Sequence, residues 1–398
     1  MKPRVLLPAL ALLAGALSAA DKVTVTVSHT LEAARPAETV VVPWPALFKN
    51  LGGNVEPDKL IVRDAAGVSL AYQFTNFNPD DRTGKYDEVL FQHDFAAGEK
   101  SATFTIERAA APVPPFAFKV FARHVPERYD DFAFENDRIA HRIYGPGLET
   151  DIAGRSRMIG SGIDVWCKRV PYPVIDRWYL RGHDAYHKDN GEGLDFYSAG
   201  TTRGAGGTGV WDGSRLRVSH NWKTARVVAN GPVRAIFELT YSTWDAGNGA
   251  TISEVKRFYV DAGVNFHRVE SRYSVRGAAS VDVAIGLGKM KDKGAELPSD
   301  VVNAPAQGIV SRWTKHANPA VEGELGTAAI LPAGFTRTLE DEANQLGLAP
   351  VKDGETVTYY VGAGWSRSGQ FADAAAWHAY VRDFQARLAA PLQVAVSR

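Results

Sequence analysis

The chain contains a single cysteine, Cys167, among its 398 residues. One cysteine excludes a disulfide framework and any zinc site built from several cysteine ligands. The sequence also lacks an excess of charge, because 45 basic residues are balanced by 45 acidic ones. Without a basic block to neutralise phosphates, we expect no nucleic-acid partner. Apolar residues make up 45% and charged residues 23% of the chain, which is typical of a folded protein and excludes a disordered one.

Long apolar runs are absent beyond residue 20. Residues 1–20 have the organisation of a secretory signal peptide, because Lys2 and Arg4 precede an apolar stretch that ends in small residues. The apolar stretch, residues 5–17, is shorter than the roughly 18 residues that a membrane-spanning helix needs. We therefore expect cleavage before Asp21, a periplasmic or secreted protein, and no membrane association after cleavage.

Alternation of apolar and polar residues with a period of two dominates the remaining sequence. Val23, Val25 and Val27 alternate with polar residues, as in a half-buried strand. Similar runs, separated by turn residues, lie at 39–42, 59–63, 71–75, 88–95, 101–107, 139–144, 162–169, 233–241, 253–260, 265–275 and 392–396. Only residues 371–388 have apolar residues at helical spacing, with Asp373 placed to cap the helix. The pattern predicts an all-β fold of large antiparallel sheets with one C-terminal helix.

A domain boundary is expected near residues 109–115, which contain three prolines. We expect an N-terminal β-sandwich portion at residues 21–115. The larger portion, residues 116–398, is then expected to carry the functional site.

A glycine-dense segment, residues 204–209, matches the pattern G-x-G-x-x-G. A dinucleotide-binding loop needs a strand before this pattern and a helix after it, so that helical N–H groups face the pyrophosphate. Here the turn-like residues 210–213 follow, and no βαβ unit is visible. We expect a loop that lets the backbone approach a sugar or an aromatic wall, rather than a nucleotide site.

The densest group of titratable side chains lies in residues 181–197, with two histidines, four carboxylates, two tyrosines, an arginine and a lysine. Such a segment, interpreted as a loop, can bring an acid, a base and an anion-binding cation together. A solvated loop without function is the plain alternative. No cofactor is expected, although a structural calcium site is an alternative for the oxygens of Asp189, Asn190, Glu192 and Asp195. His183 and His187 have the spacing of a zinc pair, but the H-E-x-x-H motif is absent.

A second cluster lies in residues 164–173, where a strand is expected to present Trp166 and Lys168 outward. Aromatic faces pack against the C–H faces of sugars, and arginine binds carboxylates through a two-point fork. An ordinary sheet surface with a half-buried tryptophan is the alternative. The predicted substrate-binding residues are Arg142, Trp166, Lys168, Arg169, Tyr172 and Trp211.

Five segments give the chain a resemblance to a known family. They are residues 87–98 (DEVLFQHDFAAG), 164–173 (DVWCKRVPYP), 186–198 (YHKDNGEGLDFYS), 203–211 (RGAGGTGVW) and 362–368 (GAGWSRS). They resemble the bacterial family catalogued as domain of unknown function 4861, over essentially the whole mature chain. The resemblance implies a β-supersandwich like that of galactose mutarotase, in which a broad concave sheet holds carbohydrate.

The resemblance also implies an activity. The family is associated with degradation of uronate-rich polysaccharides, and a related enzyme is an oligosaccharide dehydratase that acts on ulvan fragments. Such an enzyme removes water from a terminal uronate and leaves a 4,5-unsaturated sugar. The expected partner is therefore an oligosaccharide substrate.

The chemistry of this reaction suggests roles for the clustered residues. We assign the base to His187, with Tyr186 as the other candidate, and expect Asp189 or Glu192 to orient the base or to serve as the acid. Arg142, Lys168 and Arg169 would neutralise the substrate carboxylate, and Trp166, Tyr172 and Trp211 would form the sugar platform.

Three other functions remain open on the same substrates: a glycoside hydrolase that uses Asp189, Glu192 and Asp195, a polysaccharide lyase, and a non-catalytic carbohydrate-binding protein. The hypothesis requires that residues 186–195 and 166–172 line the same hollow.

Overall fold

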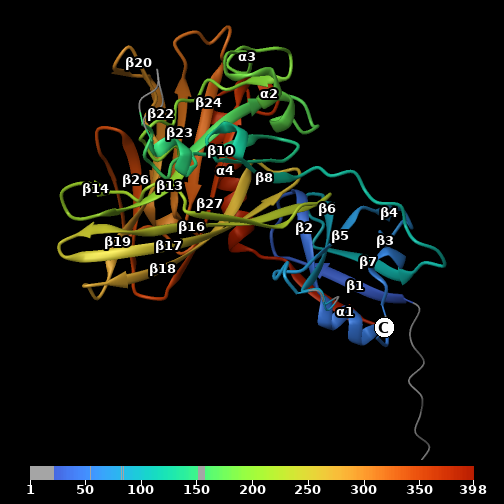
Figure 1. The fold of residues 1–398 in the computed structure, drawn as a ribbon. Coiled ribbons are helices and arrows are strands. Elements are labelled where there is room, and N and C mark those ends of the chain that lie inside the picture. Colours follow the sequence, from blue (N-terminus) through green and yellow to red (C-terminus); the bar gives the residue numbers. More distant parts are fainter. Residues whose placement is uncertain (1–21, 54, 82, 84, 151–156) are drawn as a thin grey trace, which may run out of the picture.

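The computed structural model describes residues 22–53, 55–81, 83, 85–150 and 157–398, so the predicted signal peptide at residues 1–20 lies outside the described residues (Figure 1). Strands account for 48% of the chain and helices for 14%. The predicted all-β class, with large antiparallel sheets and a helix near the C-terminus, is confirmed.

Two facing sheets form the part that is mostly blue and cyan in Figure 1, with the red C-terminal strand at the edge of one sheet. One sheet contains, in order, β28 (Gln393–Ser397), β1 (Lys22–Ser28), β7 (Ser101–Arg108), β3 (Leu60–Arg63) and β4 (Ser69–Leu70). The other contains β2 (Arg35–Pro43), β6 (Glu88–Phe95) and β5 (Tyr72–Thr75), with helix α1 (Trp44–Asn50) following β2. The apolar positions of the period-two pattern, such as Val25, Val42 and Phe91, fill the space between the sheets. A strand from the C-terminal end thus completes the sheet that β1 begins.

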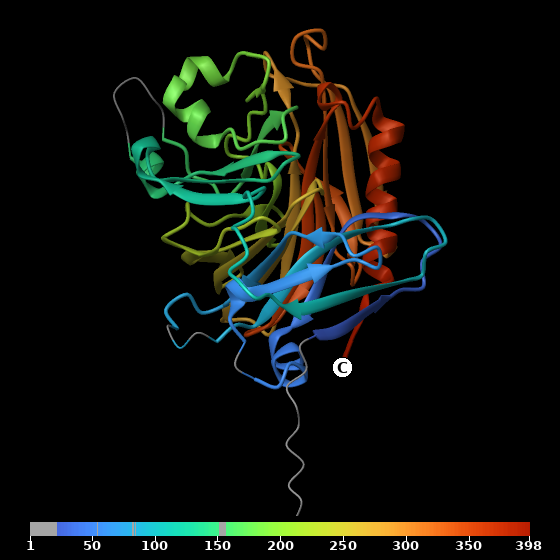
Figure 2. The same ribbon diagram turned by 90° about the vertical axis from the view of Figure 1, so that its right-hand side faces the viewer.

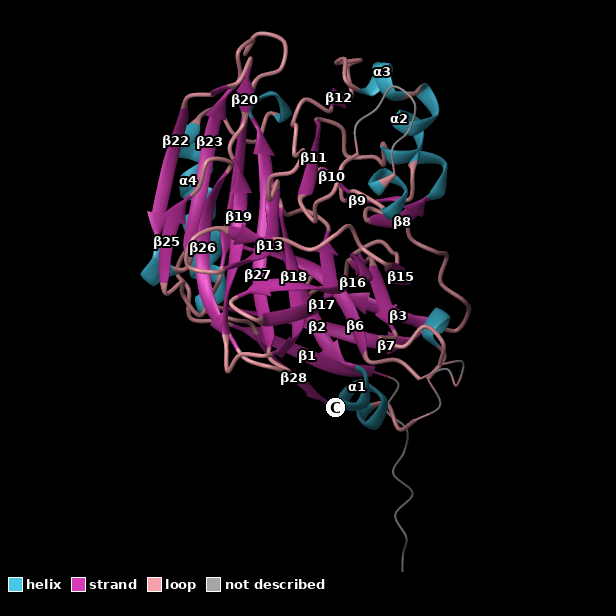
Figure 3. Cartoon of the chain, turned by 60° about the vertical axis from the view of Figure 1, so that its left-hand side comes forward, coloured by secondary structure: helices cyan, strands magenta, loops and turns pink. Residues whose placement is uncertain are grey.

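Two larger sheets enclose the main core (Figure 3). The eight-stranded sheet contains, in order, β15 (Thr224–Ala229), β16 (Arg234–Gly247), β17 (Ala250–Asp261), β18 (Phe266–Arg276), β27 (Thr356–Trp365), β24 (Glu324–Ile330), β23 (Ile309–Lys315) and β22 (Ser299–Ala304). The five-stranded sheet contains β14 (Leu216–Arg217), β13 (Ala205–Trp211), β19 (Val281–Gly288), β26 (Asn344–Val351) and β25 (Arg337–Glu340). The predicted hairpin forms where β17 and β18 pair on either side of residues 261–263.

The predicted helix is α4 (Ala374–Ala389), which lies along the outside of the eight-stranded sheet, on the side away from α2 and α3 (Figure 2). Its apolar residues, including Trp377 and Val381, pack over β23 and β24. The Asp373 side chain accepts a hydrogen bond of 2.9 Å from the Ala376 N–H, so the predicted cap is confirmed.

A third five-stranded sheet carries the candidate site. It contains, in order, β12 (Gly193–Leu194), β11 (Ile163–Lys168), β10 (Ala140–Ile143), β9 (Asp131–Glu135) and β8 (Phe121–Val125). The helices α2 (Ile175–Arg181) and α3 (His183–Tyr186) cover it, and Trp178 and Tyr186 pack against Trp166. The interpretation of residues 181–197 as a loop is therefore wrong at its start, where tertiary packing holds α3.

The remaining elements are small. They are the strands β20 (Lys291–Asp292) and β21 (Ala295–Glu296), and the 3₁₀ turns η1 (Pro57–Lys59), η2 (Pro126–Arg128), η3 (Pro146–Glu149), η4 (Pro305–Gln307) and η5 (Ser366–Ser368). Within the described ranges, none of the helices is both long and apolar enough to cross a membrane.

Candidate functional site

A cavity of about 270 Å³ opens beside β10 and α3. The side chains that line it are Arg128, Arg142, Tyr144, Leu148, Met158, His183, His187, Asp195, Phe196, Tyr197 and Ser198. The cavity therefore gathers histidine, arginine, tyrosine and carboxyl groups, which can bind an anion and exchange protons with a ligand.

His187 follows the last residue of α3, and its ring is held by the backbone. Its Nδ1 lies 2.6 Å from the carbonyl oxygen of Asp195, which can only accept, so Nδ1 carries the proton and Nε2 of the neutral ring has a free lone pair. Burial lowers the pKa of His187, and the positive charges of His183 and Arg142 lower it further, against the hydrogen bond to Asp195. His187 is therefore neutral at neutral pH, as a base must be.

Arg142 sits among three buried carboxyl groups. Its Nε donates to Asp164 Oδ2 at 3.0 Å, its Nη2 lies 3.3 Å from Asp195 Oδ2, and Asp131 Oδ2 is 3.9 Å from Nε. Burial raises the pKa of Asp131 to about 6, and burial together with the Asp164 charge raises that of Asp195 well above its ordinary value. These groups already occupy much of the Arg142 guanidinium, so its role in binding a substrate carboxylate stays a prediction.

Arg128 is a cation that the sequence analysis missed. It ends the turn η2 and lines the cavity, and its Nη1 is buried without a hydrogen-bond partner in the described part of the chain. No carboxylate of the described residues forms an ion pair with it, although Asp131 and Asp195 feel its charge. Such a buried, unsatisfied donor is a candidate for binding an anionic ligand.

Two tyrosines on the cavity wall can donate protons. Burial raises the pKa of both Tyr144 and Tyr197, and Asp164 adds to the effect, so both phenols stay protonated at neutral pH. The Tyr197 hydroxyl is buried and has no hydrogen-bond partner among the described residues. Tyr197 belongs to the titratable segment 181–197, which was the only signal in the sequence that pointed to it.

The predicted outward face of β11 is buried instead. Trp166 is 1% exposed and packs between α2 and α3, and Arg142 lies over its ring. Lys168 is also 1% exposed, and its Nζ lies 2.7 Å from Glu135 Oε2. The prediction that both side chains point outward is therefore wrong, because helices cover this face of the strand, and neither side chain lines the cavity. Tyr186, the second candidate base, is buried, does not line the cavity, and accepts a hydrogen bond from Arg142 Nη1.

The other predicted acids are held by arginines. Arg169 forms a two-point ion pair with Asp189, at 3.0 and 2.6 Å, and its guanidinium lies over the Trp365 ring. Burial acts to raise the pKa of Asp189, but hydrogen bonds from Arg169 and from the Gly191 N–H lower it below its ordinary value. Asp189 is therefore unsuited to the predicted role of a general acid.

Glu192 is fixed in the same way. Arg177 and Arg181 each bind one of its oxygens, at 2.5 and 2.9 Å, and the Tyr172 hydroxyl donates at 3.0 Å. Tyr172 itself is 44% exposed, yet it does not line the cavity. The calcium alternative requires Asp189 and Glu192 to share an ion, whereas each binds separate arginines. No group of three or more His, Cys, Asp or Glu side chains among the described residues is arranged to hold a metal ion.

The glycine-dense segment has a structural explanation. It forms β13, not a loop followed by a helix, so the geometry of a dinucleotide site is absent from this segment. Gly206 has φ +105° and an added Cβ would lie 2.1 Å from Val361 Cγ1, so only glycine lets the two strands approach. Trp211 ends β13 and packs near Leu216, Leu346 and Leu348, away from the cavity.

The structure places residues 186–195 next to residues 166–172, the two segments that were expected to line one cavity. Lys168 pairs with Gly193 across β11 and β12, and the Arg169 N–H donates to the Glu192 carbonyl at 2.9 Å. The cavity, however, is lined by six residues between 183 and 198 and by Arg128, Arg142, Tyr144, Leu148 and Met158, not by the side chains of residues 166–172. Of the ten predicted site residues, only His187 and Arg142 line it.

Solved structures with some similarity are larger proteins. An α-mannosidase from Enterococcus faecalis V583 matches 95% of this chain and 46% of its own length, at 10% identity and a TM-score of 0.44. A glycosyl hydrolase family 38 protein from Enterococcus faecalis matches 95% of this chain and 48% of its own, at 11% identity and a TM-score of 0.48. The chain thus spans about half the length of both structures.

Similarity in sequence is more extensive. A protein from Formosa agariphila, called uncharacterized protein P7, is 31% identical over 386 residues, which cover 94% of this chain and 93% of that protein. A family model described as "Domain of unknown function (DUF4861)" matches residues 27–394. The resemblance found in the sequence is thereby confirmed, and the chain belongs to the DUF4861 family.

Proposed function

We propose that the protein is an exported carbohydrate-active enzyme that catalyses β-elimination on uronate-containing oligosaccharides, forming a 4,5-unsaturated terminal uronate by loss of water. The observation that carries the proposal is the composition of one cavity. It holds the Arg128 guanidinium, whose Nη1 has no hydrogen-bond partner among the described residues, a neutral imidazole with a free Nε2 at His187, and the protonated phenols of Tyr144 and Tyr197.

Each group has a role in this reaction. The proton on C5 is acidic because C5 bears the carboxylate, and His187 Nε2 takes it while Arg128 binds the carboxylate and stabilises the enolate-like charge. A tyrosine phenol protonates the C4 hydroxyl, which leaves as water when the C4–C5 double bond forms. The C5–H and C4–O bonds break, and the net loss is one water molecule.

The cavity supports action on a chain end. Its volume, about 270 Å³, is just below the ~300–1,000 Å³ usual for sites that hold drug-sized ligands. A single terminal sugar fits this size better than the interior of a chain. A glycoside hydrolase requires a pair of carboxylates, but Asp189 and Glu192 are bound by arginines outside the cavity, and of the three candidates only Asp195 lines it.

The test is to incubate the protein with glucuronate-terminated oligosaccharides and to record ultraviolet absorbance and product mass. We expect an absorbing alkene and a product lighter by one water, without chain cleavage. His187→Ala should lower kcat by about 10²–10⁴-fold, the usual contribution of a general base. His93→Ala, which alters a histidine of strand β6 that pairs with Glu99, is the matched control and should keep full activity.

Other outcomes contradict the proposal in distinct ways. An alkene with a shortened chain identifies a lyase, and a saturated product with a new reducing end identifies a hydrolase. Binding without any product identifies a carbohydrate-binding protein. Full activity of His187→Ala removes His187 from the mechanism.

A further inference from the structure

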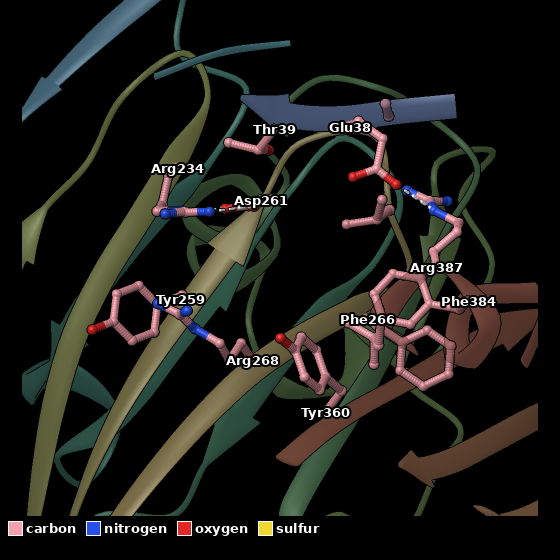
Figure 4. A pocket seen from close by; sticks show the side chains of 13 residues that line it. Glu38, Thr39, Arg234, Tyr259, Asp261, Phe266, Arg268, Tyr360, Phe384 and Arg387 are labelled. Atoms are coloured by element: carbon pink, nitrogen blue, oxygen red, sulfur yellow. Dashed lines mark hydrogen bonds and ion pairs between the residues drawn. The ribbon is translucent and has the colours of Figure 1, made fainter. Parts of the chain in front are cut away.

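A second cavity, of about 150 Å³, lies where three distant parts of the chain meet (Figure 4). Strand β2 forms one edge, the outer face of the eight-stranded sheet forms the floor, and the end of α4 forms the other edge. None of its lining residues lines the His187 cavity. It is therefore a separate candidate site.

Most charges around this cavity are paired within the protein. Arg234 binds both oxygens of Asp261, at 2.5 and 2.7 Å, and Arg387 Nε lies 2.6 Å from Glu38 Oε1. Both pairs are joined by dashed lines in Figure 4. These groups satisfy one another, so they leave little charge for a ligand.

Arg268 is the least completely paired of these arginines. Its guanidinium lies over the Tyr259 ring at 3.7 Å, and its Nε is buried without a hydrogen-bond partner among the described residues. Glu270 forms a loose ion pair with Arg268, because its Oε1 is 3.6 Å from Nη2 while its other oxygen accepts from the Tyr259 hydroxyl. Arg268 thus presents a flat, stacked guanidinium whose Nε lacks an acceptor among the described residues, and a ligand carboxylate can supply that acceptor.

The rest of the wall suits a ring. Tyr360, Phe266 and Phe384 line the cavity, and Figure 4 shows the Tyr360 hydroxyl directed toward Arg268. A cavity of about 150 Å³ accommodates a six-membered ring such as benzene. We propose that this cavity binds a single sugar ring that carries a carboxylate, with the carboxylate on Arg268 and the ring against Tyr360.

Binding is measured by calorimetric titration of the full chain in an Arg128→Ala background, which removes the proposed anion-binding residue of the His187 cavity. The ligands are D-glucuronate and D-glucose, which differ in the carboxylate. We expect glucuronate to bind the background protein and glucose to bind about tenfold more weakly or worse. Adding Arg268→Ala should weaken glucuronate binding about tenfold or more. Adding Arg272→Ala, an exposed arginine four residues along β18, should change nothing.

Two results overturn the proposal: glucuronate binding that is unchanged by Arg268→Ala, and an absence of glucuronate binding to the background protein. If Arg268→Ala lowers the unfolding temperature, Arg268→Lys takes its place, because it keeps the charge and loses the fork; unchanged affinity in that variant also overturns the proposal. This experiment measures affinity and not turnover. A failure of the elimination activity at His187 therefore does not contradict binding at Arg268, and a failure of binding at Arg268 does not contradict the elimination activity.

Discussion

At the scale of single residues, the candidate site depends on which polar groups the protein itself already satisfies. Arg142 and Arg128 both line the cavity, yet Asp164 and Asp195 bind Arg142, whereas Nη1 of Arg128 has no hydrogen-bond partner in the described ranges. The sequence pointed to Arg142 and His187 because they lie in or near dense polar segments. It did not point to Arg128, because a lone arginine in a 3₁₀ turn has no pattern to mark it.

The environment of His187 leads to a prediction on pH. Its pKa is lowered below the usual 6.5, first by burial, so the neutral base persists as pH falls through 6.5 and is lost only below it. We expect the acid limb of kcat/KM to have its midpoint below pH 6.5. His183→Asn removes one charge that lowers this pKa, so the midpoint should move to higher pH. A wild-type midpoint above pH 6.5 would contradict the assignment.

At the scale of elements, the spacing of apolar residues predicted the strands and the helix that bury one apolar face. The strands β1 and β6, the β17–β18 hairpin and α4 all follow alternation or helical spacing that the core then buries. The helices α2 and α3 were missed, because helices of seven and four residues form through packing rather than through propensity. The prediction that one face of β11 is exposed was also wrong, because alternation in the sequence cannot reveal that helices cover that face.

The glycine-dense strand β13 allows a matched test of close packing. Gly206 and Gly213 both have positive φ, +105° and +98°, but an added Cβ meets Val361 only at Gly206. Gly213→Ala should cost roughly 1–2 kcal/mol from backbone strain alone. Gly206→Ala should cost about 2 kcal/mol more, because Val361 must move within the core. Urea unfolding of both variants measures the difference, and equal losses would refute the steric explanation.

At the scale of the whole molecule, the N-terminal sheet depends on the other end of the chain. Strand β28 covers the edge of β1, and Val394 and Val396 pack on the N-terminal core. Residues 109–120, which contain no strand or helix, connect this part to the rest. The predicted division at residue 115 stays a prediction. A division there assigns β28 to the C-terminal portion by sequence, although β28 pairs with β1 in the sheet of the N-terminal portion.

Deleting residues 393–398 tests the contribution of β28. The loss of two half-buried valines should lower the free energy of unfolding by about 2 kcal/mol. The exposed edge of β1 should also promote association between molecules. Thermal unfolding and light scattering measure the two effects, with deletion of Arg398 alone as the control. A deletion protein that is as stable and as monodisperse as the control would show that β28 is dispensable.

The pairing of β1 with β28 also sets how the molecule responds to tension. Thr24 lies opposite Ser397 and Ser28 lies opposite Gln393, so both ends of the chain leave this pair at the same side. A force that pulls these two strand ends apart therefore breaks the hydrogen bonds between β1 and β28 one after another. It does not load all of them at once in shear. The N-terminal sheet would then yield first in a single-molecule stretching experiment, while the larger sheets around the His187 cavity still hold.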